Sequence, residues 1–237
     1  SITGNASVTL NASGGIAVGN VTSRTEININ SDRANISTGN LLVTEAGQGG
    51  INLEAYGDIT TGELTSPSGL NLTSTSGNIT TDNIFTRATV GTGGNIDISS
   101  KVGFVETGSL DTTGPGGGGN IEIRASDRVA AGRIDASSTL GNGGSVILNA
   151  GGDVEAVSID TGGGVAGRGG NLTVSAGVNF RVTDTLTVTL GTETVAASIS
   201  TAGGTGPGAI AIQHGAPENC SPGATCGNTA LDRKSVV

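Results

Sequence analysis

Three aspartates stand at one position of a repeating pattern, where carboxylate oxygens could bind a divalent cation. Asp111, Asp135 and Asp160 each follow the last apolar residue of a short apolar group. In a parallel solenoid these carboxylates would form a row about 4.8 Å apart, where like charges repel each other. Oxygen ligands of this kind suit Ca²⁺, which would be the only cofactor expected.

A second interpretation of the aspartate row is structural. The sequence contains no Gly-Gly-x-Gly-x-Asp calcium repeat, so the pattern favours solvated carboxylates that splay apart and pair with arginines. The arginines proposed for this role are Arg128, Arg133 and Arg168.

No other group of residues has the types and spacing of a catalytic site. His214 is the sole histidine and has no Asp and Ser pattern around it that would complete a triad. A glycan-cleaving enzyme would need paired carboxylates or a basic residue beside a cleft, usually with aromatic platforms, and Tyr56 is the only tyrosine. Glycine-rich runs such as 116–119 lead into strands, so they are not phosphate-binding loops. We therefore expect no catalytic or cofactor-binding residues and a protein that is not an enzyme.

The two cysteines, Cys220 and Cys226, lie close together in a stretch that has no apolar periodicity. The Pro and Gly between them allow a chain reversal, which favours a local disulfide and an oxidising, extracytoplasmic compartment. Two free thiols are the alternative.

The candidate residues are positioned by a repeat of about 25 residues. A Gly-Gly pair precedes Asn95, Asn120, Ser145 and Asn171, at steps of 25, 25 and 26 residues. Each unit then has three apolar groups separated by Gly, Asn, Asp and Ser. The first groups are Ile96/Ile98, Ile121/Ile123, Val146/Leu148 and Leu172/Val174. The second are Phe104, Val129, Val154 and Phe180, and the third are Leu110, Ile134 and Ile159.

This periodicity predicts an all-β fold, a right-handed parallel β-helix of about eight to nine coils with roughly 19–26 residues each. The same pattern begins earlier coils at Val8, Ile27, Ile51 and Leu70. Gly-Gly, Gly-Asp and Gly-Asn supply the corners, and only the last connection of each coil changes length. Asn95, Asn120 and Asn171 share one position, where stacked amides are expected to hydrogen-bond along the axis.

The sequence divides into a β-helix over 1–215 and an aperiodic tail or cap over 216–237. In the last complete unit the third apolar group is delayed until Ile199. The insertion near 183–197 alternates Thr with apolar residues, which predicts a β-hairpin or an extra strand that leaves the coil.

Composition restricts the classes of partner. The net charge of −9 disfavours nucleic acid and anionic membranes. The uninterrupted apolar stretches are only a few residues long, so no transmembrane segment is expected. The start at Ser1 and the absence of Met lead us to expect a mature or excised segment.

Segments 169–177 (Gly-Gly-Asn-Leu-Thr-Val-Ser-Ala-Gly) and 57–66 (Gly-Asp-Ile-Thr-Thr-Gly-Glu-Leu-Thr-Ser) resemble repeats of filamentous-haemagglutinin-type exoproteins of two-partner secretion systems, especially cyanobacterial members. Segment 208–215 is similar to the last coil of such regions. The resemblance covers roughly 5–215 and implies a repeat shaft, because the Asn-Pro-Asn motifs of that family's secretion domain are missing. It implies no functional residues.

We expect a secreted or cell-surface rod, adhesive or structural and non-catalytic, whose partner is a glycan or protein on a host or neighbouring cell. The first alternative is a subunit of an extracellular filament that assembles end to end. The second alternative is a polysaccharide lyase or hydrolase built on a β-helix.

Overall fold

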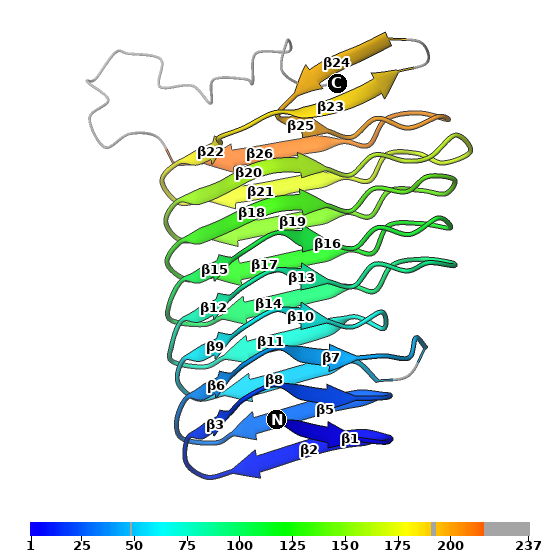
Figure 1. Cartoon of the computed structure of the whole chain (residues 1–237). Coiled ribbons are helices and arrows are strands. Elements are labelled where there is room, and N and C mark those ends of the chain that lie inside the picture. Colours follow the sequence, from blue (N-terminus) through cyan, green and yellow to red (C-terminus); the bar gives the residue numbers. More distant parts are fainter. Residues whose placement is uncertain (48, 191–192, 216–237) are drawn as a thin grey trace, which may run out of the picture.

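The computed structural model describes residues 1–47, 49–190 and 193–215, and these residues form a column of stacked parallel strands without any helix (Figure 1). The chain rises through the column one coil at a time, and each coil contributes a strand to each of three faces. The predicted parallel β-helix is confirmed.

The first face is a parallel sheet of nine strands, one per coil. Its strands are β2 (Ser7–Ala12), β5 (Glu26–Ser31), β8 (Ile51–Ala55), β11 (Leu70–Ser74), β14 (Ile96–Ser100), β17 (Ile121–Ala125), β19 (Val146–Ala150), β21 (Leu172–Ala176) and β26 (Ile210–His214).

The second and third faces belong to one hydrogen-bonded sheet, because two strands run through both. These two are β18 (Val129–Asp135) and β20 (Val154–Asp160). The second face also contains β3 (Ile16–Val18), β6 (Ile36–Thr38), β9 (Ile59–Thr61), β12 (Ile79–Thr81), β15 (Val105–Thr107) and β22 (Phe180–Val182). The third also contains β1 (Ile2–Gly4), β4 (Val21–Ser23), β7 (Leu41–Val43), β10 (Leu64–Thr65), β13 (Ile84–Phe85), β16 (Leu110–Asp111) and β25 (Ile199–Ser200).

The interior is a column of stacked aliphatic side chains. Ile121 pairs in register with Ile96 below it and with Val146 above it, and all three are buried. The alternation of apolar and polar residues at period two places one set inside and the other in solvent. The expected register of the first apolar group in each coil is therefore confirmed.

Buried hydroxyls complete the interior at the corner between the third and first faces. Thr112 Oγ1 donates to the carbonyl of Gly119 at 2.7 Å, and Thr161 Oγ1 donates to the carbonyl of Gly170 at 2.8 Å. Both threonines are fully buried, so these bonds satisfy side chains that would otherwise destabilise the core.

The sequence-based register was wrong by one residue at Phe104. Val105 is the inward residue, pairing with Ile79 and Val129, while Phe104 is half-buried. The turn before Val105 is one residue longer than in the next coil, and the Ser100 hydroxyl accepts a hydrogen bond from the Gly103 amide at 2.9 Å within it.

The predicted amide stack also differs from the structure, because each amide bonds to backbone rather than to the next amide. Asn95 Oδ1 accepts from the amide of Asn120, Asn120 Oδ1 from Ser145, and Asn171 Oδ1 from Ala209, each at 2.8 Å. Other Asn and Asp side-chain oxygens accept backbone amides in the same way at further corners, namely those of Asn20, Asn35, Asn40, Asp58, Asn78, Asn83, Asn142 and Asp153. Each side chain thus ties its corner to the coil above.

The insertion near 183–197 forms an antiparallel hairpin of β23 (Leu186–Leu190) and β24 (Glu193–Ala197). It lies above β25 in Figure 1. Its inner side chains form a separate small apolar cluster that includes Ala202.

The strand beneath the hairpin, β25, is well buried. Ile199 of β25 is only 4% exposed, although no further strand pairs with β25 above it in the described ranges. Ile210 and Ile212 of β26 are half-buried at the same end. The predicted tail or cap over 216–237, with Cys220 and Cys226, lies outside the described residues.

Close backbone contact at the corners requires glycine. A Cβ atom added to Gly144 would lie 2.0 Å from the carbonyl oxygen of Gly119 in the coil below. One added to Gly118 would lie 1.8 Å from the carbonyl oxygen of Ala136, where the loop of the next coil begins. The Gly-Gly pairs therefore permit successive loops to stack closely.

We expect Leu148→Ala to lower the free energy of unfolding by about 2–5 kcal/mol, because it leaves a cavity inside the column. Ile147→Ala on the same strand is the matched control, because Ile147 points outward and is 38% exposed. Urea unfolding followed by circular dichroism measures both. Equal losses for the two variants would contradict the register.

Gly144→Ala should destabilise the column by about 1–3 kcal/mol or more, because backbone must move to admit the methyl group. Gly14→Ala is the control, since a Cβ atom there would have no neighbour within 4 Å. The urea midpoints of the two variants test this expectation, which fails if Gly144→Ala unfolds at the parental midpoint.

Candidate functional site

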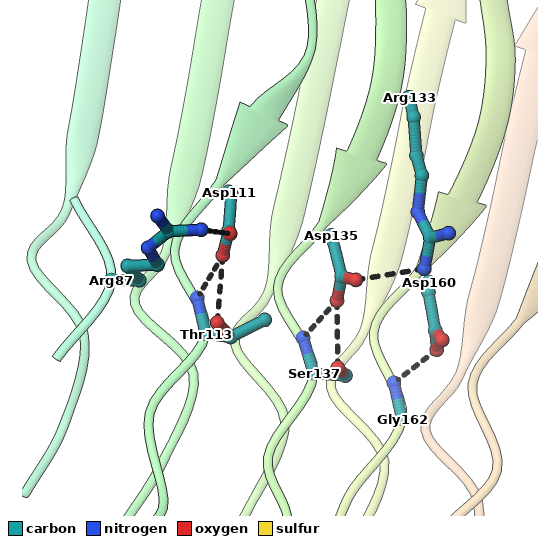
Figure 2. Close-up of polar contacts among 8 residues, drawn as sticks. All are labelled: Arg87, Asp111, Thr113, Arg133, Asp135, Ser137, Asp160 and Gly162. Carbon is teal, nitrogen blue, oxygen red and sulfur yellow. Dashed lines mark hydrogen bonds and ion pairs between the residues drawn. The ribbon is translucent and has the colours of Figure 1, made fainter. Parts of the chain in front are cut away.

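The three aspartates predicted as a row do lie in register on the third face. Asp111 ends β16, Asp135 ends β18 and Asp160 ends β20, and the strand pairing places them directly over one another. Ser200 of β25 occupies the next position, so the carboxylate row ends at Asp160. Figure 2 shows the row and its polar contacts.

Each aspartate starts the loop that follows its strand. One carboxylate oxygen accepts from the amide two residues later, at 3.0 Å for Asp111, 3.1 Å for Asp135 and 2.9 Å for Asp160 (Figure 2). The hydroxyls of Thr113 and Ser137 donate to the same oxygens of Asp111 and Asp135, at 2.7 and 2.6 Å. These are Asx-type turns, in which the carboxylate replaces a backbone acceptor.

Arginines neutralise the two lower aspartates. Arg87, from the loop after β13, lies 3.3 Å from Asp111, and Arg133, on β18 itself, lies 2.8 Å from Asp135 (Figure 2). The sequence analysis named Arg133 correctly but missed Arg87. The signal was available, because Phe85 pairs with Asp111 and Arg87 follows Phe85 by two residues.

Two of the arginines proposed as partners lie elsewhere, which corrects that part of the prediction. Arg128 forms an ion pair with Glu106 at 2.8 Å, and its guanidinium lies 4.8 Å from the centre of the Phe104 ring. Arg168 is exposed in a loop and forms no ion pair with the described part of the chain.

Asp160 differs from its neighbours because no arginine forms an ion pair with it among the described residues. Burial raises the pKa of Asp160 above its usual value, and the charge of Asp135 raises it further. The Gly162 amide, the Ser200 hydroxyl and the more distant Arg133 charge oppose this rise. The folded protein therefore favours the neutral form of Asp160 more than the unfolded chain does.

The geometry of the row suits structure better than metal binding. In the described ranges, no three His, Cys, Asp or Glu side chains gather as they would around a metal ion. A cation at Asp111 or Asp135 would have to displace an arginine as well as the turn contacts. The calcium site predicted for Asp111, Asp135 and Asp160 gains no support from the described residues.

A shallow groove of about 460 Å³ lies along β20 and β22, a feature that the sequence analysis missed. Its lining includes Phe180, Asp153, Glu155 and Arg181. Glu155 forms an ion pair with Arg181 at 2.8 Å, and Asp153 accepts two hydrogen bonds from Asn179 at 3.0 Å. The signal was the repeated placement of polar residues on both sides of Val154 and Phe180 in successive coils.

A second shallow depression, of about 490 Å³, carries mainly acidic and amide groups. Its carboxylates belong to Glu63, Asp82 and Glu106. Glu106 is the carboxylate that pairs with Arg128, and no aromatic ring lines this depression within the described residues. Its chemistry resembles an acidic solvated surface more than a binding cleft.

The remaining candidate residues are not brought together. His214 ends β26, and its Nδ1 lies 3.2 Å from the carbonyl oxygen of Gly215, with no Ser and Asp partners in the described part of the chain. The cysteine pair falls outside the part of the chain that the structure describes. None of the described residues belongs to a helix long and apolar enough to cross a membrane.

We expect Asp160→Asn to stabilise the protein at pH 7, because it removes a charge that the fold disfavours while keeping an acceptor for Gly162. The folded pKa is raised, so the carboxyl contributes its full stability below the unfolded pKa and loses it as pH rises through the folded pKa. The gain of the variant should therefore disappear near pH 3. Asp111→Asn, which breaks the pair with Arg87, is the control in urea titrations. A gain that persists at pH 3 would refute burial of the Asp160 charge as its cause.

Comparisons of this chain with protein-family models, with curated proteins and with solved structures found no match.

Proposed function

We propose that this chain is a non-catalytic β-helical rod of a secreted or cell-surface protein, with an adhesive or structural role. The observation that carries the proposal is the use of polar side chains within the stack. The aspartates of the row bond to turns and arginines, and the corner Asn and Asp residues bond to the coil above. Groups that an enzyme would leave free for a substrate are engaged in joining one coil to the next.

The architecture supports a mechanical role. From the first coil up to the coil of β21, β22 and β25, successive coils are joined by parallel backbone hydrogen bonds on three faces, an arrangement that suits a stiff rod. Many outward strand positions carry short polar side chains, such as Asn52, Asn71 and Thr173, which suits contact with a glycan or protein surface in water. The resemblance to filamentous-haemagglutinin-type shafts agrees with this role and favours a rod outside the cell.

End-to-end assembly into a filament is the first alternative. At the C-terminal end of the described column, Ile210 and Ile212 are half-buried and β26 has an edge that no described strand pairs with, which another chain could cover. The β23–β24 hairpin occupies the space above β25, so a stacked copy would have to pack around it (Figure 1). Negative-stain electron microscopy separates the alternatives, because filaments that lengthen with concentration would favour this one.

A glycan-cleaving enzyme is the second alternative, and the Phe180 groove is the observation that favours it. Two carboxylates, an arginine and an aromatic ring line one groove of a size that ligand sites have. Against catalysis, Glu155 is paired with Arg181 and Asp153 is bonded to Asn179. A general acid would need a free carboxyl at the scissile bond.

We expect beads that carry the full chain to attach to host cells, bacterial cells or their extracellular polysaccharides more strongly than beads carrying a globular acidic protein. If no surface retains them, the adhesive role is refuted, and stiff monodisperse rods in micrographs would then support the structural role alone.

The same polysaccharides test the enzyme alternative. Release of new reducing ends by the parent, abolished in Asp153→Asn/Arg181→Gln, would overturn the non-catalytic proposal. Attachment without release supports it.

A further inference from the structure

The loops between the third and first faces of the upper coils form a thin projection beside the column, which we call the fin (Figure 1). The fin consists of residues 88–95, 113–120, 137–145, 162–171 and 202–209. Its loops are joined coil to coil by backbone hydrogen bonds, for example from Gly116 to Gly91 at 2.7 Å and from Gly164 to Gly141 at 2.8 Å. The fin is therefore an ordered extension of the stack.

The edge of the fin carries an apolar residue in each of four successive loops. Val90, Pro115, Leu140 and Val165 follow one another at intervals of 25 residues, and we call this row the apolar ridge. Their loops are in register, because the amide of Leu140 donates to Pro115 and that of Ala166 donates to Leu140, both at 3.2 Å. Val90 is 86% exposed, Val165 78% and Leu140 57%, while Pro115 is half-buried, so the ridge faces solvent at three of its four positions.

The fin is also nearly uncharged, although the whole chain has a net charge of −9. It contains no carboxylate, and Arg168 is its single charged residue. Two rods that approached through their acidic faces would repel each other, whereas two fins bring together only their Arg168 charges. The apolar ridge is therefore the surface where a second acidic rod meets the least charge repulsion.

We infer that the apolar ridge is the contact between two copies of this chain, which pair side by side along their fins. The repeat distance supports a second copy over other partners. The ridge side chains repeat once per coil, at a rise of about 4.8 Å. A partner whose side chains repeat at the same rise can place them between the ridge side chains along the whole ridge, and a partner with another spacing cannot. This inference is independent of the proposed adhesive function.

The single fin charge sets the direction of pairing. In a parallel pair the two Arg168 side chains, each beside Val165, would lie together and repel. In an antiparallel pair they lie at opposite ends, Val90 faces the partner's Val165, and Pro115 faces the partner's Leu140. The pair is then isologous, as two-fold dimers are.

The contact is small, so the dimer should be weak. Four side chains per copy bury less than the roughly 800 Å² per partner of a standard interface. We expect dissociation constants between about 10 µM and 1 mM for a contact of this size.

Sedimentation velocity of the full chain across that concentration range tests the pairing. We expect a concentration-dependent dimer that Leu140→Asp/Val165→Asp weakens at least about tenfold, which is 1.4 kcal/mol. Val102→Asp/Val178→Asp is the matched control, because these valines are 61% and 51% exposed in turns away from the fin. A monomeric parent, or equal weakening by both double variants, would overturn the inference.

Cysteine cross-linking tests the direction. With Cys220 and Cys226 replaced by serine, a mixture of Val90→Cys and Val165→Cys chains should form a mixed disulfide dimer under mild oxidation. Val90→Cys alone should not form a dimer above the level of a Val102→Cys control. Efficient disulfide dimers of Val90→Cys alone would show that the two rods pair in parallel. Equal yields of cross-linked dimer at all sites, including the Val102→Cys control, would refute the contact. Binding to neutral lipid vesicles that needs the ridge while the protein stays monomeric would identify a membrane as the occupant and also refute it.

Discussion

Parallel hydrogen bonding between successive coils is the constraint on which the rest of this structure depends. It requires that each corner pass directly over the corner below, at the spacing of neighbouring strands. At Gly144 this leaves no space for a Cβ atom against the Gly119 carbonyl. It also places an amide such as that of Asn120 above the corner beneath, where the Asn95 side chain accepts its hydrogen bond. Glycine is common at the corners because closely stacked backbone leaves no space for a Cβ atom. Asparagine is common there because its side-chain oxygen accepts a hydrogen bond from a backbone amide of the next coil.

The same stacking decides what chemistry the surface can hold. A residue type repeated at one position forms a row, and a row of aspartates brings like charges together. The chain reduces this repulsion by adding an arginine from the loop below, as Arg87 does for Asp111, or from the same strand, as Arg133 does for Asp135. At Asp160 no such arginine is present within the described residues, and the row stops at Ser200. In this row the carboxylates hold their loops through the amides two residues later, and those of Asp111 and Asp135 are also paired with arginines, so few groups are left free for other chemistry.

The fold could be predicted from the sequence because the inward positions repeat every coil, and an error in one coil is exposed by its neighbours. Local turn length is not constrained in this way. Phe104 was placed inside because the spacing of the next coil was assumed, whereas the Ser100 hydroxyl holds a turn that is longer by one residue. The pair of Arg87 with Asp111 was missed because it depends on register between coils and not on distance along the chain. The Phe180 groove joins two coils in the same manner, so no single stretch of sequence displays it.

The column and the fin differ in what fills their interior. In the column, aliphatic side chains such as Ile123 fill the space between three faces, and their loss exposes a cavity. In the fin, the two arms of a loop are joined through backbone, as the hydrogen bond from the Gly119 amide to the Thr112 carbonyl at 2.8 Å shows. Val90, Leu140 and Val165 at the edge of the fin are largely exposed, so they contribute little packing to the fold, whereas the inward residues of the column are buried. Burial within the fold therefore does not explain the apolar side chains at these three positions, and the inferred contact with a second copy would explain them.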